Sequence, residues 1–218
     1  MPKLVTLQEK YHKNAWSSHP VMVAEIDLTD SIDAPPGLFE DLIRLLPVRL
    51  PGVLYIAPDA SVVEVLHWIV RSLQNYHDIA PPVSGVLVDE QERTATIHYA
   101  YGDPHFAPLP VRSAVALVHA AITGDVSGPQ MLAGIDQVLH TCSAHALDQV
   151  TREMTREIDR RRIPWRREFG RFIDAGHGVT MRSFLESRVG DESWIAVSLS
   201  VNKLQSLQAF QQAGIPVG

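Results

Sequence analysis

The pattern of apolar and polar residues predicts three strands in the first half of the chain. The run VMVAEIDL at 21–28 is rich in β-branched and apolar residues, as a buried strand is. SGVLVDE at 84–90 and RTATIHYAY at 93–101 have the same character. The polar residues between these two segments are typical of a turn, so we expect them to form a β-hairpin.

Two segments between these strands carry apolar residues at helical spacing. GLFEDLIRLLP at 37–47 predicts a short amphipathic helix, which we expect to end at Pro47 because proline disrupts a helix interior. SVVEVLHWIVRSLQNY at 61–76 predicts a longer helix with one broad apolar face. Asp59 and Ser61 are the candidate N-caps of this longer helix.

The sequence favours helix again from residue 111 to residue 162. VRSAVALVHAAIT at 111–123 predicts a strongly apolar helix that stops at Gly124. No proline interrupts the stretch from 130 to 162, so we expect it to be helical throughout, with a heavily charged part after Thr151. The Ile-Pro-Trp segment at 163–165 then ends the helix.

The sequence changes character after residue 160. REFGRFIDAGHG, VTMRSFLES and SWIAVSLS are short strand-like pieces separated by glycines and polar turns, and a final helix ends at Gly214. We therefore predict an α+β protein with a mixed α/β N-domain at 1–160 and a small α/β domain at 161–218. We also expect the last residues, GIPVG, to open a domain that continues beyond them.

Composition and charge narrow the function. The 218 residues are 45% hydrophobic and carry a net charge of −6, which argues against general nucleic-acid binding because such domains usually have a basic face. The single Cys142 excludes an intramolecular disulfide framework, and we expect it to be a small buried hydrophobe rather than a nucleophile. The sequence shows no signal peptide and no apolar run of the roughly 20 residues that span a bilayer. We expect a cytoplasmic protein with no membrane or nucleic-acid partner.

Glu64 and His67 stand three residues apart and share one face of their helix. Glu-x-x-His at this spacing holds a metal when another helix supplies further ligands. The alternative is an exposed glutamate beside a helix-packed histidine. We expect no bound metal and keep the two residues as candidate ligands only. Structural roles are also expected for His98, His105, His119, His140 and His145.

Five arginines lie between residues 160 and 167: Arg160, Arg161, Arg162, Arg166 and Arg167. Guanidinium groups make bidentate contacts with phosphate and carboxylate groups, so this cluster is a candidate for binding phosphate or an acidic polymer. The alternative is a solvated helix end whose cations interact favourably with the helix dipole.

The last third of the chain resembles a known family. RRIPWRRE, IDAGHGVTMRSFLES and WIAVSLSVNKLQSLQAFQQAGIPVG, in this order, are similar to the region that leads into the ATP-grasp domain of cyanophycin synthetases. Upstream, the family's amino-terminal region is similar to NAWSSHPVMVAEIDLTD, GLFEDLIRLLP and TIHYAYGDPHFAPLPVRSAVALVHAAI. The resemblance covers nearly the whole chain, and it implies that the chain ends where a nucleotide-binding lobe would begin.

The resemblance implies part of a ligase that joins aspartate and arginine into a polymer. The family's ATP-grasp and Mur-ligase-like domains have no counterpart here, so we expect the chain to be inert as a ligase by itself, with no catalytic residue. ATP and magnesium are expected only together with the ATP-grasp domain, supplied in cis or by a partner in trans. The implied role is to hold an amino-acid or peptide substrate and to scaffold that domain, and homo-oligomerisation is left open.

The resemblance also implies roles for individual residues. Lys203 is expected to reach towards the nucleotide phosphates in the full ligase. Arg182 and Arg188 match the family's basic strand and join the five arginines above as candidates for binding substrate or polymer. His177 and Asn202 replace the family's usual tyrosine and aspartate.

One helix departs from the family in a way that bears on chemistry. Some members carry a metal-dependent hydrolytic site on a His-x-x-Glu-His helix. The matching helix here reads Glu64-Val-Leu-His67-Trp68, and Trp68 cannot ligate a metal, so we do not expect hydrolysis. Two alternatives stay open: a free-standing binding or assembly protein with the same fold and, with less support, a small metallohydrolase built on Glu64 and His67.

Overall fold

Helices and sheets are both well represented, and the α+β class predicted from the sequence is confirmed. In the described part of the computed structural model, 46% of the residues are in helices and 23% are in strands. None of the helices in the described ranges combines the length and the apolar character that crossing a bilayer requires. The structure describes residues 1–10, 14–31, 33–35, 37–50, 55–76, 83–104, 106–124, 128–144, 146–167, 172–185, 188–189 and 203–212.

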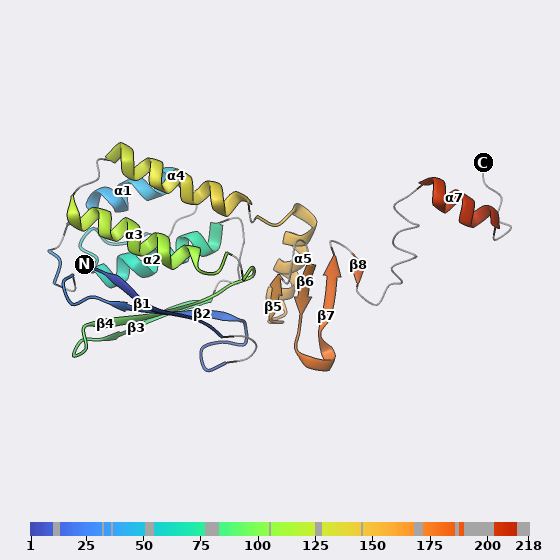
Figure 1. Ribbon diagram of the computed structural model, residues 1–218, viewed down its shortest axis with the longest axis horizontal. Coiled ribbons are helices and arrows are strands. Elements are labelled where there is room, and N and C mark those ends of the chain that lie inside the picture. The colour runs from blue at the N-terminus through green and yellow to red at the C-terminus, as the bar shows by residue number, and fades with distance from the viewer. Residues whose placement is uncertain are drawn as a thin grey trace.

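A four-stranded antiparallel sheet lies in the first part of the chain (Figure 1). Its strands are β1 (Lys3–Lys10), β2 (Val21–Asp27), β3 (Ser84–Asp89) and β4 (Thr94–Ala100), in the spatial order β1-β2-β4-β3. Strand β2 and the hairpin of β3 and β4 confirm the prediction. The sequence did not reveal β1, an edge strand whose partly exposed positions mix charged and apolar residues.

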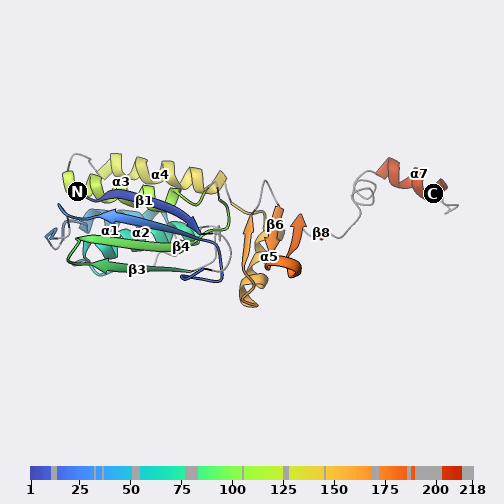
Figure 2. The same cartoon turned by 60° about the horizontal axis from the view of Figure 1, so that its bottom comes forward.

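Four helices lie on one side of this sheet, and no helix of the described ranges lies on the other side (Figures 1 and 2). The strands alternate accordingly. Ala24 and Ile26 of β2 and Ile97 of β4 are fully buried beneath the helices, whereas Thr96 and His98 of β4 lie on the uncovered face and are partly exposed. The helices are α1 (Glu40–Arg49), α2 (Val62–Asn75), α3 (Leu109–Thr123) and α4 (Gly128–Ala144).

Two helix ends that the sequence predicts can be compared with the structure. Helix α3 stops at Gly124, whose φ of 64° lies in the left-handed region that favours glycine. Helix α1 does not end at Pro47 as predicted, but continues to Arg49. Pro47 lies in the last turn, where its missing N–H removes a single helical bond, and the Leu50 N–H still donates to the Leu46 carbonyl at 2.9 Å.

The second part of the chain contains a helix and a small sheet in which consecutive strands pair. Helix α5 (Gln149–Arg160) precedes an antiparallel sheet in the order β5-β6-β7-β8. The bounds are β5 (Trp165–Arg167), β6 (Phe172–Ala175), β7 (Arg182–Leu185) and β8 (Arg188–Val189), and helix α7 (Lys203–Gln212) follows. The strand predicted at SWIAVSLS and the stop at Gly214 lie outside the described residues.

The helix predicted from 130 to 162 is two helices, α4 and α5, so the prediction of one continuous helix was wrong. Asp148 begins α5: its carboxylate accepts the Thr151 N–H at 3.1 Å and the Thr151 hydroxyl at 2.6 Å. An N-cap of this kind starts a new helix.

Ile158 of α5 packs into the second core with Leu147, Trp165, Ile173 and Ala175. The predicted domain boundary at residue 160 therefore stays a prediction. The connection between α4 and α5 is an alternative position for this boundary.

Helix α5 ends in a Schellman motif. The Ile163 N–H donates to the Ile158 carbonyl at 3.0 Å, and the Arg162 N–H donates to the Asp159 carbonyl at 2.8 Å. Arg162 has a φ of 57° and occupies the left-handed position that glycine usually fills. The motif places Ile163 against the second core and directs the chain into β5.

Candidate functional site

Glu64 caps the helix on which it lies. Its carboxylate accepts the Ser61 N–H at 2.7 Å and the Ser61 hydroxyl at 2.8 Å, and the Glu64 N–H donates to the Ser61 oxygen at 3.3 Å. This reciprocal arrangement is a capping box. The hydrogen bonds from Ser61 lower the pKa of Glu64. The carboxylate is therefore engaged at the N-terminus of α2, and Ser61 rather than Asp59 is the N-cap.

His67 bridges α2 and the sheet. Its Nε2 lies 3.2 Å from the Ser84 hydroxyl of β3. Burial first, and then the charges of Arg71 and His98, lower the pKa of His67, so the imidazole is neutral at pH 7. Trp68 beside it is buried in the core. Within the described ranges, no three His, Cys, Asp or Glu side chains lie close enough together to hold a metal ion.

The other histidines are dispersed. His98 on β4 stacks against Trp16 with ring centroids 4.6 Å apart. His119 and His140 are exposed on α3 and α4, and His105 and His145 lie outside the described residues. His98, His119 and His140 lie on three different elements and do not form one site.

Cys142 is a buried thiol on α4. It is fully inaccessible, and burial raises the pKa of the thiol to about 12. A thiol with this pKa is protonated at neutral pH and is a poor nucleophile. The structure places Cys142 in the apolar core, as the sequence predicts.

Arg160 and Arg161 share one carboxylate. Both are exposed at the end of α5, and their Nε atoms lie 2.7 Å and 2.6 Å from Glu157 oxygens. The hydrogen bonds from Arg160 and then Arg161 lower the pKa of Glu157 to about 2. Arg162 beside them is also exposed. This part of the cluster is a solvated helix end, in which Glu157 offsets part of the positive charge.

Arg166 and Arg167 lie on β5 and face buried carboxylates. Arg166 pairs with Asp174 at 3.7 Å, and Arg167 pairs with Asp103 at 3.5 Å. The Ser183 hydroxyl also donates to Asp174 at 2.6 Å. These four charged side chains are mostly buried, so these pairs help to hold the structure together.

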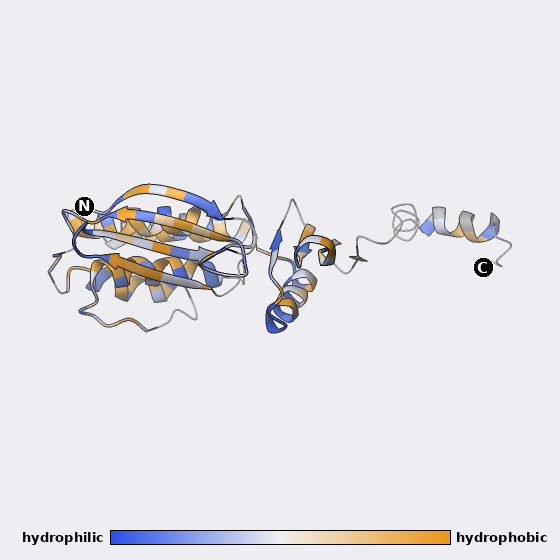
Figure 3. Ribbon diagram, turned by 90° about the horizontal axis from the view of Figure 1, so that it is seen from below, coloured by the Kyte–Doolittle hydropathy of each residue, from blue (hydrophilic) through white to orange (hydrophobic). Residues whose placement is uncertain are grey.

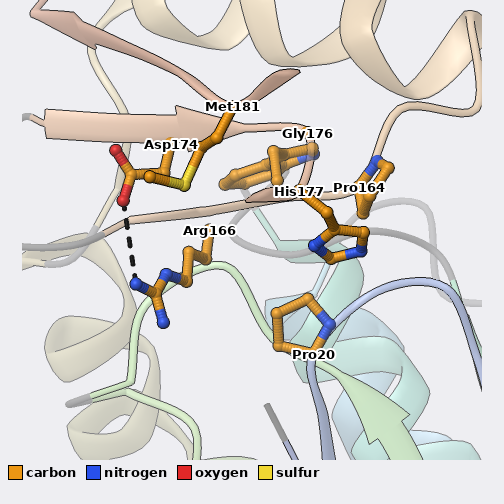
Figure 4. Close-up of a pocket in the computed structure, with 8 residues that line it drawn as sticks. Pro20, Pro164, Arg166, Asp174, Gly176, His177 and Met181 are labelled. Atoms are coloured by element: carbon orange, nitrogen blue, oxygen red, sulfur yellow. Dashed lines mark ion pairs between the residues drawn. The ribbon is translucent and has the colours of Figure 1, made fainter. Parts of the chain in front are cut away.

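A small cavity marks the junction between the two parts of the chain (Figure 4). Pro20 from the first part meets Arg166, Asp174 and His177 from the second. The His177 Nε2 lies 3.1 Å from the Ser18 carbonyl oxygen. The cavity volume is about 10 Å³, which suits one water molecule and excludes a substrate. His177 therefore takes part in the junction.

A larger space lies between α5 and the second sheet, and we call it the α5 groove. Its volume is about 510 Å³, within the range of small-molecule sites. Arg161 and Arg182 both line it, so two of the seven candidate arginines meet at one place. The apolar lining is Met154, Ile158, Ile163, Ala175 and Phe184, and the polar lining also includes Glu157 and Thr180.

The remaining candidates lie on β7, β8 and α7. Arg182 is exposed, and its guanidinium donates to the Met181 carbonyl at 3.0 Å. The backbone of Arg188 lies in β8, and its side chain is outside the described part of the chain. Lys203 is exposed at the start of α7, and Asn202 lies outside the described residues.

Sequence reasoning missed three carboxylates: Glu157, Asp174 and Asp103. Glu157 stands three and four residues before Arg160 and Arg161, a helical spacing that favours ion pairs and could have revealed it. Asp174 interrupts the otherwise apolar strand FIDA and thereby signals a buried partner. Nothing in the sequence places Asp103 beside Arg167, because the two are far apart in the chain.

No protein-family model matches this chain. No curated protein matches its sequence significantly. The similarity to cyanophycin synthetases therefore rests on the motifs quoted above and stays a proposal.

Proposed function

We propose that this chain is the substrate-holding and scaffolding region of a cyanophycin-synthetase-like ATP-grasp amino-acid ligase. In this proposal the α5 groove binds an acidic amino acid or an aspartate-containing peptide. The observation that supports it best is that Arg161 and Arg182 line one groove together with several apolar side chains.

The chemistry of the groove suits such a ligand. A guanidinium binds a carboxylate through two parallel N–H donors, which fixes the orientation of the carboxylate as well as its charge. Ile158 and Phe184 offer apolar surface to the methylene groups of an amino acid or peptide. Glu157 is the carboxylate in the described lining, and it is already engaged by Arg160 and Arg161. With two guanidinium groups and one carboxylate, the described lining carries a net positive charge, which favours an anionic ligand.

A nucleotide would belong to a separate lobe. ATP with magnesium would supply the activation of the substrate carboxylate when that lobe is present. Lys203 is exposed at the start of α7, where an ammonium group can approach phosphates. Arg166 and Arg167 are less suited to ligand binding than Arg161 and Arg182, because their side chains are mostly buried, whereas Arg161 and Arg182 are exposed.

A free-standing binding or assembly protein is the second candidate. It is favoured by Leu87 and Val88 on edge strand β3, which are 57% and 46% exposed although both are apolar. A metallohydrolase has the least support, because the Glu64 carboxylate is bonded to Ser61.

Calorimetric titration with a short aspartate-rich peptide, and with the same peptide carrying asparagine, tests the proposal. We expect only the acidic peptide to bind. Arg161→Gln and Arg182→Gln should each weaken its binding about 10-fold, or about 1.4 kcal/mol. Arg160→Gln is the matched control, because Arg160 shares Glu157 with Arg161 but does not line the groove. Equal binding of both peptides, or equal losses in all three variants, would contradict the proposal.

A further inference from the structure

A third space lies between helices α3 and α4, and we call it the α3–α4 groove. Its volume is about 420 Å³, within the range of small-molecule sites. The two helices are joined by the short segment 124–127 and run antiparallel, side by side (Figure 1). Figure 3 views the first sheet from the side without a described helix, and there α3 and α4 lie in the helical layer behind the sheet. The groove is therefore distinct from the α5 groove.

Each of the two helices is held mainly by a different neighbour. Helix α3 packs against α2, whereas α4 packs against α1, and Arg49 of α1 pairs with Asp136 of α4 at 3.0 Å. The residues that line the groove between α3 and α4 include Ala116 and Ala120 on α3 and Gly134 on α4. Because other contacts fix the two helices, side chains as small as these leave the space between them unfilled.

The described lining of the groove is mostly apolar and carries one charge. Leu117 and Met131 are 8% and 5% exposed and form its buried apolar surface, to which Val138 adds. Arg112, near the start of α3, is the charged residue of the described lining. Arg112 is exposed, and within the described ranges no ion pair or side-chain hydrogen bond engages its guanidinium. This guanidinium is therefore available to an anionic ligand.

We propose that the α3–α4 groove binds a small aliphatic molecule that carries one carboxylate, such as a medium-chain carboxylic acid. The carboxylate pairs with Arg112, and Ser113 offers a hydroxyl at the same end of the groove. The aliphatic chain covers Leu117 and Met131. From Ser113 to Ala120 the lining follows α3 for about two turns, or about 10 Å, so an elongated ligand suits the groove. This proposal does not depend on the proposed function.

The lining selects both parts of this ligand. Burial of an aliphatic chain is favourable roughly in proportion to the apolar area removed from water, and most of the described lining is apolar. The charge of Arg112 attracts a carboxylate and repels an amine, and the described lining contains no carboxylate that would attract a cation. A neutral alcohol would leave the guanidinium without an ionic partner. An anionic head group is therefore favoured over a neutral or a cationic one.

Calorimetric titration of the full chain with octanoate and with octanol tests the proposal. We expect octanoate to bind at least about 10-fold more tightly than octanol, a difference of about 1.4 kcal/mol. Arg112→Gln should remove this difference by weakening the binding of octanoate alone. Arg71→Gln is the matched control, because Arg71 is exposed on α2 and does not line the groove. It should leave the binding of both compounds unchanged.

Gly134→Leu tests the space itself. A Cβ at Gly134 meets no atom within 4 Å, so the new side chain can enter the groove without a clash. Leucine also favours a helix more than glycine does, so the variant should fold at least as stably as the wild type. It should weaken the binding of octanoate and of octanol alike, at least about 10-fold. Ala133→Leu is the matched control, because Ala133 is exposed on α4 beside Gly134 and lies outside the groove lining.

Methyl NMR of the wild-type chain locates the bound compound. Met131 lines the α3–α4 groove and Met154 lines the α5 groove, so octanoate should shift the Met131 methyl signal and leave the Met154 signal in place. No shift, or a shift of Met154 alone, would overturn the proposal. So would equal binding of octanoate and octanol. A wild-type dimer that Gly134→Leu dissociates would also overturn it, because the groove would then bind a second copy of the chain.

Discussion

Ser61 and Glu64 close a reciprocal pair of hydrogen bonds at the start of α2, with the Glu64 carboxylate 2.7 Å from the Ser61 N–H. The residue that sequence offers as a metal ligand therefore has a structural role that needs no metal. The same bonds lower the pKa of Glu64, which ties the stability of α2 to pH.

Glu64→Ala should lower the free energy of unfolding by about 1 kcal/mol, because the Ser61 N–H loses its acceptor. Glu64→Gln should lose less, since the amide oxygen still accepts this bond. The pKa of Glu64 is lowered in the folded state, so its contribution is complete above the unfolded pKa and is lost as the pH falls through the folded pKa. Urea unfolding at neutral and acidic pH measures both effects.

Glu153→Ala is the control for this substitution, because Glu153 pairs with exposed Arg156 on α5, a helix whose N-cap is Asp148. Elemental analysis of the wild type, Glu64→Ala and His67→Ala should give the same metal content. About one zinc per wild-type chain, lost in His67→Ala, would instead support the metallohydrolase.

Asp174→Asn should destabilise the protein by about 2 kcal/mol, because it removes the charge that faces Arg166 in a mostly buried setting. The exposed pair of Asp41 and Arg44 provides the comparison, and Asp41→Asn should cost less than about 0.5 kcal/mol. Thermal unfolding monitored by calorimetry measures both. Equal effects of the two substitutions would show that Asp174 behaves as a surface residue.

The carboxyl of Glu157 should titrate near pH 2, far below its ordinary value of 4.5. Since the folded pKa is depressed, the stabilising contribution of this carboxylate is present above pH 4.5 and is lost as the pH falls through about 2. Carbon NMR of the carboxyl group follows the titration. Arg160→Gln and Arg161→Gln should each move its pKa upwards, and high salt should move it in the same direction. A Glu157 pKa that no substitution changes would contradict the shared ion pair.

Cys142 should resist thiol reagents in the native protein. Its folded pKa of about 12 leaves almost no thiolate near pH 8, and no part of the residue is accessible. We expect modification at least roughly 100-fold slower than in urea, limited by opening of the structure around α4. Absorbance of the released reagent measures the rate. Rapid native reaction, with α4 still protected from hydrogen exchange, would argue that the thiol is reachable and activated.

Much of the first sheet and its helices could be predicted because local patterns there agree with tertiary burial. The alternation in VMVAEID and TATIHYA matches one covered face, and Gly124 stops α3 where its backbone needs a positive φ. Prediction from the sequence failed where the local residue pattern differs from what the tertiary structure stabilises. Strand β1 is stabilised by pairing with β2 rather than by its own apolar content, and Pro47 is tolerated because α1 has almost ended.

The candidate site was less predictable for a physical reason. The sequence marks arginines but not the carboxylates that neutralise them, and these partners decide which guanidinium groups remain available. Asp103 meets Arg167 only after the second sheet docks against the first part. The start of α5 was the exception, because Asp148 followed by Thr151 is a recognisable N-cap pattern that could have divided the long helix.

The two sheets differ in the length of chain that each pairing must close, and this has a consequence for the order of folding. In the second sheet every strand pairs with the next one in sequence. In the first sheet β2 pairs with β4, although two helices and some seventy residues lie between them. This pairing runs from Val21 with Ala100 to Asp27 with Thr94. Closing a longer loop costs more chain entropy before any contact forms. We therefore expect the amide of Ile173 to gain protection from hydrogen exchange earlier than the amide of Ile97 in pulse-labelled refolding. Simultaneous protection would mean that the two sheets form as one cooperative unit.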